Sequence, residues 1–144
     1  MKTKTFQLLF LAVLFIAAFS CTKKDEVKPS KTSILTAKPW ILTKVEAAGI
    51  NVTDAYLDDC DKDDTEKFNT DHTIYENIGT VKCDKDDVNS TGQWSLKEND
   101  TVLSITFFGK TIEGKITELT ATTLKLSAKD EDTGATIIIT FVVV

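Results

Sequence analysis

The sequence contains no arginine, and it has a single histidine among its 144 residues. Its 17 basic residues are therefore all lysines, and 22 acidic residues outnumber them to give a net charge of −5. Nucleic-acid binding needs a clustered basic surface, so this composition excludes nucleic acid as a partner. The sequence also lacks the G-x-S-x-G, H-E-x-x-H and P-loop motifs. Adjacent, solvated aspartates rarely provide the buried acid that a glycosidase requires, so we expect no enzyme and no catalytic residue.

Long hydrophobic runs are also scarce, and the longest is the unbroken apolar stretch from Leu8 to Phe19. It is too short for a membrane span, which needs about 20 apolar residues. With Lys2 and Lys4 in front of it, the run is typical of a signal peptide. The segment that follows, Ala18 to Cys21, resembles the cleavage box of bacterial lipoproteins. That resemblance implies removal of residues 1–20 and lipidation of Cys21; the alternative is an ordinary secreted protein with an incidental thiol.

Residues 21–32 form a polar stretch without apolar periodicity, which predicts a flexible tether between the lipid and a domain over 33–144. Lys24, Asp25 and Glu26 resemble the export signal that directs Bacteroidetes-type lipoproteins to the outer face of the outer membrane. The resemblance implies an outer-membrane lipoprotein that is exposed on the cell surface. Anchoring toward the periplasm is the alternative, since any acidic, lysine-rich tether could contain these three residues.

Cysteine is rare, and with Cys21 assigned to the anchor only Cys60 and Cys83 remain. An even pair in an oxidising compartment predicts a disulfide. A closed loop of 24 residues would stabilise the fold by roughly 3 kcal/mol in the chain-entropy view. Two thiols without nearby histidines fall short of the four ligands that zinc requires.

Aspartates crowd around both cysteines, and hard cations such as calcium bind such oxygens. The spacing of Asp59, Asp61 and Asp63 imitates the start of an EF-hand loop, but Asp64 and Thr70 stand where Gly and Glu are needed. An irregular calcium site is one interpretation, and solvated acidic loops are the other. The weak calcium candidates are Asp59, Asp61, Asp63, Asp84 and Asp86; otherwise we expect no cofactor.

From Trp40 onward, short runs of alternating apolar and polar residues are separated by turn residues. We expect one helical turn within 33–38 and strands at 40–45, 65–68, 73–76, 92–96, 103–107, 112–117, 124–128 and 136–144. The last of these is apolar on both faces, which would be an aggregation hazard at an open sheet edge. Short connections favour an all-β, eight-stranded antiparallel up-and-down barrel, with a β-sandwich as the alternative.

Several motifs of the body resemble the lipocalin-like domain of Bacteroidetes lipoproteins. They are Trp40 at the start of the first strand, C-D-K-D-D-T-E-K-F from Cys60 to Phe68, D-H-T-I-Y from Asp71 to Tyr75, and Cys83 followed by G-Q-W-S-L from Gly92. The resemblance covers about residues 33–144 and implies a small barrel on a lipid tether. Lipocalin barrels are similar to cups that hold small apolar ligands.

The resulting hypothesis is a membrane-anchored lipoprotein that binds a small apolar or amphipathic molecule in its barrel. An eight-stranded barrel is just wide enough to be filled by side chains or to hold one small ligand. The candidates to line a ligand site are Trp40, Phe68, Trp94, Leu103, Ile105, Phe107, Ile116, Leu124, Leu126 and Phe141; equally, they could form the core. Gly114 could leave room for a ligand or for a bulky neighbour. The alternative function is a non-catalytic accessory lipoprotein that binds an outer-membrane protein.

Overall fold

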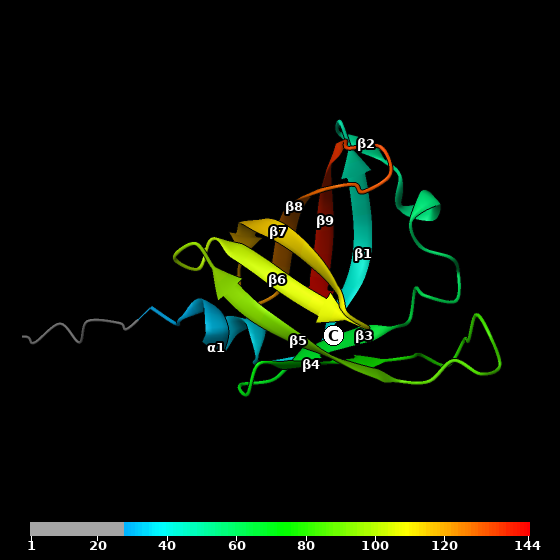
Figure 1. The fold of residues 1–144 in the computed structure, drawn as a ribbon, viewed down its shortest axis with the longest axis horizontal. Helices are drawn as coiled ribbons and strands as arrows, with labels where there is room; N and C mark the ends of the chain where they lie inside the picture. The colour runs from blue at the N-terminus through cyan, green and yellow to red at the C-terminus, as the bar shows by residue number, and fades with distance from the viewer. Residues whose placement is uncertain (1–27) are drawn as a thin grey trace, which may run out of the picture.

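The computed structural model describes residues 28–144, and the predicted signal peptide and Cys21 lie outside this part of the chain. The described residues form nine strands and two short helices (Figure 1). Their bounds are α1 (Lys31–Leu35), β1 (Trp40–Ala47), β2 (Ile50–Asn51), the 3-10 helix η1 (Thr53–Ala55), β3 (Thr65–Phe68), β4 (Thr73–Asn77), β5 (Ser90–Lys97), β6 (Val102–Phe107), β7 (Lys110–Leu119), β8 (Thr123–Lys129) and β9 (Thr136–Val143). Within this part, no helix is long and apolar enough to cross a membrane.

The strands form one antiparallel sheet that closes on itself. From β3 to β9 every strand pairs with its neighbour in sequence, and β1 pairs with both β3 and β9. Seven residue pairs join β1 to β9, whereas only Trp40 and Glu66 pair between β1 and β3. The short β2 only extends β1 as a hairpin. The all-β, eight-stranded up-and-down barrel is thus confirmed, and the sandwich alternative is wrong because β9 pairs with β1 instead of ending at an open edge.

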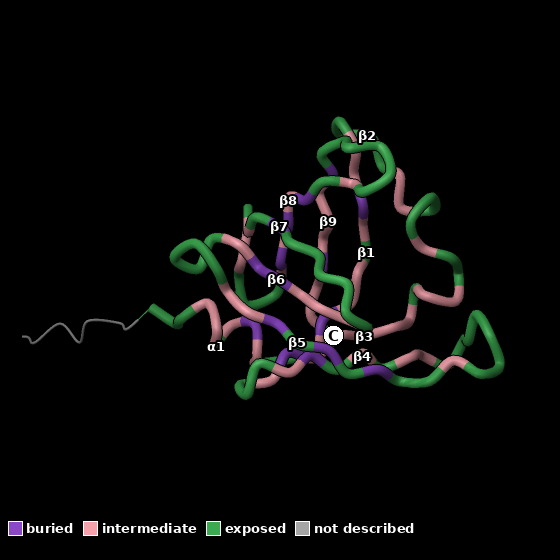
Figure 2. Tube along the Cα trace, in the orientation of Figure 1, coloured by how far each residue is buried: buried purple, intermediate pink, exposed green. Residues whose placement is uncertain are grey.

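One end of the barrel is closed by a cluster of buried apolar side chains. Figure 2 marks the buried residues along the trace of the chain. The helix α1 begins where the Ser30 side chain accepts a hydrogen bond from the amide of Ser33, and its Leu35 is fully buried. Trp40 Nε1 donates to the carbonyl oxygen of Leu35 at 2.9 Å, which fastens the helix to β1. Successive residues of a strand face opposite sides of the sheet, so every second side chain points into the barrel. The apolar side chains that point inward pack against Leu35 of the helix and against one another.

The second tryptophan lies in the same closed end. Trp94 on β5 packs edge-on against Phe68 on β3, with ring centroids 5.4 Å apart. Its Nε1 donates to the carbonyl oxygen of Asn69 at 3.0 Å, so its polar atom is satisfied inside the core. The two tryptophans therefore tie α1 and the β3–β4 turn to the base of the barrel.

The strands match the predicted segments, with most of them longer by one to three residues. The helical turn begins at Lys31 and ends at Leu35, earlier than the expected 33–38, because Ser30 provides the N-cap. The hairpin to β2 and the 3-10 helix η1 were not predicted. Both belong to the long connection between β1 and β3, where two-residue pairing and a single helical turn leave no periodic signal.

Candidate functional site

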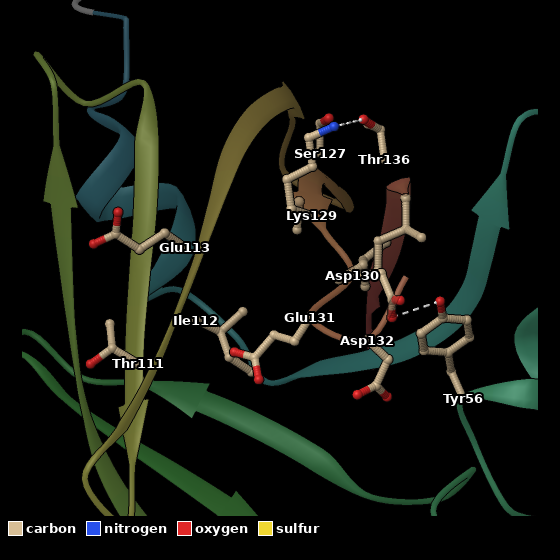
Figure 3. Close-up of a pocket in the computed structure, with 13 residues that line it drawn as sticks. Tyr56, Thr111, Ile112, Glu113, Ser127, Lys129, Asp130, Glu131, Asp132 and Thr136 are labelled. Atoms are coloured by element: carbon tan, nitrogen blue, oxygen red, sulfur yellow. Dashed lines mark hydrogen bonds between the residues drawn. The ribbon is translucent and has the colours of Figure 1, made fainter. Parts of the chain in front are cut away.

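A cavity of about 620 Å³ opens at the end of the barrel opposite α1 (Figure 3). We call it the mouth cavity. It lies between the first residues of β7 and the end of the β8–β9 hairpin, with Tyr56 closing one side. Its lining residues are Tyr56, Thr111, Ile112, Glu113, Ser127, Ala128, Lys129, Asp130, Glu131, Asp132, Thr136, Ile137 and Ile139.

The inner wall of the mouth cavity is apolar. Ala128 and Ile137 are buried, and they pair across β8 and β9. Ile139 packs against the same cluster. On the other side, Ile112 lies on the same face of β7 as the inward-facing Gly114, and its side chain, which is 60% exposed, lines the opening. An apolar wall of this kind suits a hydrocarbon or ring.

The rim of the mouth cavity is polar and fixed by short-range hydrogen bonds. The hydroxyl of Tyr56 donates to Oδ2 of Asp130 at 3.0 Å, which raises the pKa of the tyrosine. The backbone amide of Thr133 donates to Oδ1 of Asp130 at 2.7 Å, and hydrogen bonds from both Thr133 and Tyr56 lower the pKa of that carboxyl. Lys129 Nζ donates to Thr136 Oγ1 at 2.8 Å. An apolar wall under a polar rim is the usual chemistry of a small-molecule pocket.

The ten predicted lining residues lie deeper than the mouth cavity. Seven are buried in the main core: Trp40, Phe68, Trp94, Leu103, Leu124, Leu126 and Phe141. The other three, Ile105, Phe107 and Ile116, are partly buried against that core. None of the ten lines the mouth cavity. Alternation identified the inward face of each strand, but it carries no information about which end of the barrel is filled.

Gly114 makes room for a neighbouring side chain. A Cβ atom on this residue would lie 3.0 Å from Cβ of Leu126, which comes from the adjacent strand β8. The neighbour is thus an aliphatic residue of the core, and the space beside Gly114 is filled.

A smaller pocket, of about 160 Å³, lies where β1 and β3 diverge. We call it the acidic pocket, and its lining residues are Leu42, Leu57, Asp61, Asp64, Glu66 and Glu76. Burial, and to a lesser degree the negative charge of Glu76, raise the pKa of Glu66 to about 7. Charged residues on the inner face of the barrel were not predicted from the sequence. The signal was present, because Glu66 lies on the same face of β3 as the buried Phe68, and Glu76 lies on the same face of β4 as the buried Ile74.

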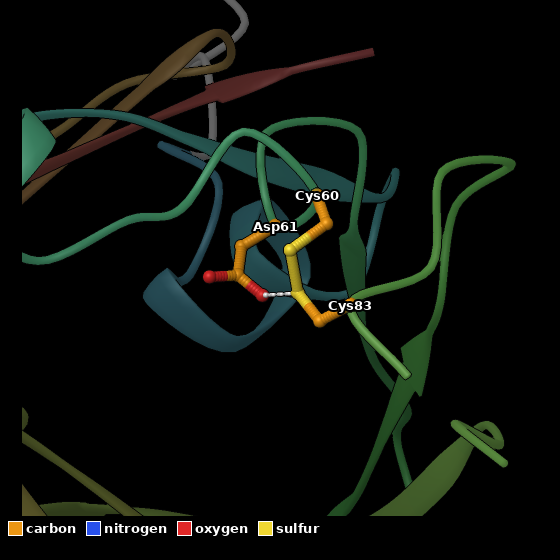
Figure 4. Close-up of side chains that lie close together, drawn as sticks. All are labelled: Cys60, Asp61 and Cys83. Atoms are coloured by element: carbon orange, nitrogen blue, oxygen red, sulfur yellow. Dashed lines mark hydrogen bonds between the residues drawn. A yellow bond between two sulfur atoms is a disulfide. The ribbon is translucent and has the colours of Figure 1, made fainter. Parts of the chain in front are cut away.

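The predicted disulfide between Cys60 and Cys83 is confirmed, with Cα atoms 5.1 Å apart (Figure 4). It joins the segment before β3 to the loop between β4 and β5. Asp61 Oδ1 lies 3.1 Å from Sγ of Cys83. Metal ions are bound by His, Cys, Asp and Glu side chains. In residues 28–144, one group of three such residues has its ligand atoms all within 4.8 Å of one another: Cys60, Asp61 and Cys83. Its sulfurs are bonded to each other, so the group offers no thiolate to a metal.

The five calcium candidates make local contacts in the loops on either side of the disulfide. Asp63 Oδ2 accepts hydrogen bonds from the Thr80 amide at 2.6 Å and from its hydroxyl at 2.9 Å, which lower the pKa of Asp63. Asp59 pairs with Lys62 at 2.7 Å. The remaining contacts are those of Asp61 with the amide of Asp58, of Asp84 with the amide of Asp86, and of Asp86 with Lys85. These contacts explain how the aspartates hold the loops in place, and they do not point to a bound calcium ion.

The lipocalin-like domain family matches the chain over residues 36–126. The chain belongs to this family. The match begins before β1 and ends within β8, so it covers most of the closed barrel. No curated protein matches the chain. Lipocalin-like barrels are generally binding folds without catalytic activity, which agrees with a cavity at one end of a packed barrel.

Proposed function

We propose that this lipocalin-like domain holds a small apolar or amphipathic molecule in the mouth cavity. One observation carries the proposal: a cavity of about 620 Å³ whose inner wall is formed by Ala128, Ile137 and Ile139 beneath a polar rim. Ligand sites in proteins have volumes of about 300–1,000 Å³ and combine an apolar lining with a few polar groups. The apolar part of the ligand would contact the wall, and its polar end would face Tyr56 and Lys129.

We propose further that the domain belongs to a lipoprotein anchored through Cys21 to the outer membrane of a Bacteroidetes-type bacterium and exposed on the cell surface. The support is the sequence: residues 1–20 as a signal peptide, residues 21–32 as a tether, and Lys24, Asp25 and Glu26 behind the cysteine. The described chain begins beside α1, at the end of the barrel away from the mouth cavity (Figure 1). A tether at that end would leave the cavity open to the surroundings.

The ligand proposal is tested by binding of the neutral fluorescent probe N-phenylnaphthylamine. Ile112→Glu places a charge on the cavity wall, and we expect it to weaken probe binding by at least about tenfold, since burying an unpaired charge against an apolar ligand costs more than 1.4 kcal/mol. Ile50→Glu is the matched control because Ile50 is 68% exposed, close to the 60% of Ile112, and lies outside the cavity.

Native mass spectrometry of protein purified from its own cells supplies the second readout, since a retained ligand appears as added mass. If the probe does not bind and no ligand is retained, the ligand proposal is wrong, and a non-catalytic accessory protein that binds an outer-membrane partner becomes the better account.

The anchor is tested by Cys21→Ser. We expect the unchanged protein to sediment with membranes and to carry a lipid mass on its first residue after cleavage, and we expect Cys21→Ser to appear in the soluble fraction. Treatment of intact cells with a protease distinguishes the two faces of the membrane, because only a surface-exposed domain would be digested. An unlipidated wild-type protein would contradict the anchor.

A further inference from the structure

The acidic pocket lies where the barrel wall is least fully paired among the described strands. Strand β1 meets β3 through Trp40 and Glu66 alone, and beyond this point the two strands run apart (Figure 1). The segment between η1 and β3 crosses this gap and contributes Leu57, Asp61 and Asp64 to the pocket. The pocket is therefore enclosed by three parts of the chain: strand β1, the β3–β4 hairpin and the crossing segment.

Two glutamates face each other inside this pocket. Glu66 and Glu76 are directly opposite in the β3–β4 register, which places their Cβ atoms about 5 Å apart. Oε2 of Glu66 is enclosed by protein and has no hydrogen-bond partner among residues 28–144. Glu76 has a partial partner, because the hydroxyl of Ser90 donates to its Oε2 at 2.6 Å. Like charges opposite each other on a sheet destabilise it, so this arrangement calls for a cation.

The described lysines do not supply that cation. None of the ion pairs within residues 28–144 includes Asp61, Asp64, Glu66 or Glu76. The nearest lysines in sequence are committed elsewhere: Lys62 to Asp59 and Asp54, and Lys67 to the carbonyl oxygen of Thr36 at 2.5 Å. The pocket is thus lined by four carboxylates and two leucines, and no lysine of residues 28–144 forms an ion pair with those carboxylates.

We propose that the acidic pocket binds a small organic ammonium ion, with its charged head between Glu66 and Glu76 and its hydrocarbon against Leu42 and Leu57. The ammonium would donate to the enclosed oxygen of Glu66, which has no other partner in the part of the chain that the structure describes. This site is separate from the mouth cavity, with which it shares no lining residue. It can therefore be occupied or abolished independently of the proposed function.

The shape of the pocket favours an organic cation over a bare metal ion. A calcium ion needs six to eight oxygens around one point. In the described chain, the pocket carboxylates do not form a group of three whose ligand atoms lie within 4.8 Å of one another. About 160 Å³ with two leucines in its lining is also more room, and more apolar surface, than an ion can use.

Protonation gives the site a characteristic pH dependence. The groups that face Glu66 are Glu76 from β4 and Asp61 and Asp64 from the crossing segment, while β1 contributes only the apolar Leu42. All of these charges are negative, and the pKa of Glu66 is raised to about 7. An ammonium ion must displace the proton of Glu66, so its affinity should rise as the pH increases through about 7.

The experiment is an NMR titration of the full mature protein with n-butylammonium chloride as the probe, followed through the amide signals of residues 28–144. Butyrate and n-butanol are the matched anionic and neutral probes, and calcium chloride is the metal probe. We expect n-butylammonium to shift the amide signals of Glu66, Glu76 and Leu42 in a saturable manner. We expect it to bind at least about tenfold more tightly than n-butanol, since a charge-assisted hydrogen bond contributes that much.

Two variants and one control complete the test. Glu66→Gln and Glu76→Gln should each weaken n-butylammonium binding by about tenfold or more, and Glu66→Gln should also remove the pH dependence. Glu98→Gln removes one negative charge from the exposed turn after β5 and should leave the affinity within about twofold. Equal binding of n-butylammonium and n-butanol, or unchanged affinity in Glu66→Gln, would overturn the proposal. Saturation of the same signals by calcium alone would also overturn it, in favour of a metal site.

Discussion

The two ends of the barrel are formed by the same strands but are filled in opposite ways. At the end capped by α1, Trp40, Phe68 and Leu35 are almost completely buried, and both tryptophan nitrogens have hydrogen-bond partners. Away from that end, the same strands surround the mouth cavity and, in the wall between β1 and β3, the acidic pocket. Among residues 28–144, two enclosed carboxylate oxygens in this part of the barrel, Oδ1 of Asp63 and Oε2 of Glu66, have no hydrogen-bond partner.

The difference indicates a division of roles along the barrel axis. The closed end contributes the packed apolar contacts on which the stability of a small domain depends. The open end and the wall between β1 and β3 carry features that oppose stability, namely unfilled volume and like charges brought together. Polar groups without partners are costly in a folded protein and often mark functional sites. Neutralising Glu66 should therefore change stability in the direction opposite to that of truncating Trp40.

The largest effect is expected at the closed end. Trp40→Ala removes the biggest fully buried side chain together with its hydrogen bond to Leu35, and should lower the free energy of unfolding by about 3–5 kcal/mol. Chemical denaturation followed by circular dichroism measures this change. Phe108→Ala is the control, because Phe108 is 88% exposed and its loss should cost less than about 0.5 kcal/mol. A similar loss in both variants would contradict a core centred on Trp40.

The next effect concerns the disulfide, which lies at the open end. Cys60→Ser combined with Cys83→Ser should lower the free energy of unfolding by about 3 kcal/mol, because the loop of the unfolded chain is no longer closed. Denaturation of the unchanged protein with and without a reductant gives an independent measurement, and the double variant should not respond to the reductant. An unchanged midpoint in both experiments would show that the bridge does not stabilise this end.

Glu66→Gln should act in the opposite direction. Glu66 has a pKa of about 7 in the folded protein against an ordinary value near 4.5, so the folded state holds its proton more tightly. Its contribution to stability is full below about pH 4.5 and is lost as the pH rises through about 7. Above pH 7 the variant should exceed the unchanged protein by up to about 3 kcal/mol, at about 1.4 kcal/mol per pKa unit.

Denaturation at a series of pH values, with the unchanged protein subtracted from the variant, isolates this contribution from the other carboxyls. Glu98→Gln is again the matched control and should give a difference close to zero at every pH. A difference between Glu66→Gln and the unchanged protein that does not vary between pH 5 and about 8 would contradict the raised pKa.

The smallest effect is expected for Gly114→Ala, between the two ends. The added methyl group would lie 3.0 Å from Cβ of Leu126, so β7 and β8 must move slightly apart, at a cost of about 1 kcal/mol. Leu126→Gly in the same chain removes that Cβ atom and should relieve the contact, so the two substitutions should be less than additive. A stabilising Gly114→Ala would indicate open space beside this residue.

The sequence was sufficient for the strands of the barrel and for the disulfide, because alternation and an even pair of cysteines are local signals. It identified Leu103, Leu124 and Phe141 as inward-facing, and they are. It did not indicate that the filled end of the barrel lies beside α1, because both ends of a strand alternate in the same way. The pocket around Glu66 was also missed: it depends on the divergence of β1 from β3, and the sequence carries no signal for that gap.

Strand β1 has two edges with very different surroundings. Along one edge its backbone groups meet β9 through seven residue pairs, and along the other they meet β3 through one pair and the short β2 through two. Hydrogen exchange should therefore divide the amides of this single strand into a slow set directed at β9 and a fast set directed at the gap. Thermal opening of the barrel would begin along the fast edge, and the wall would part there while β9 stays attached.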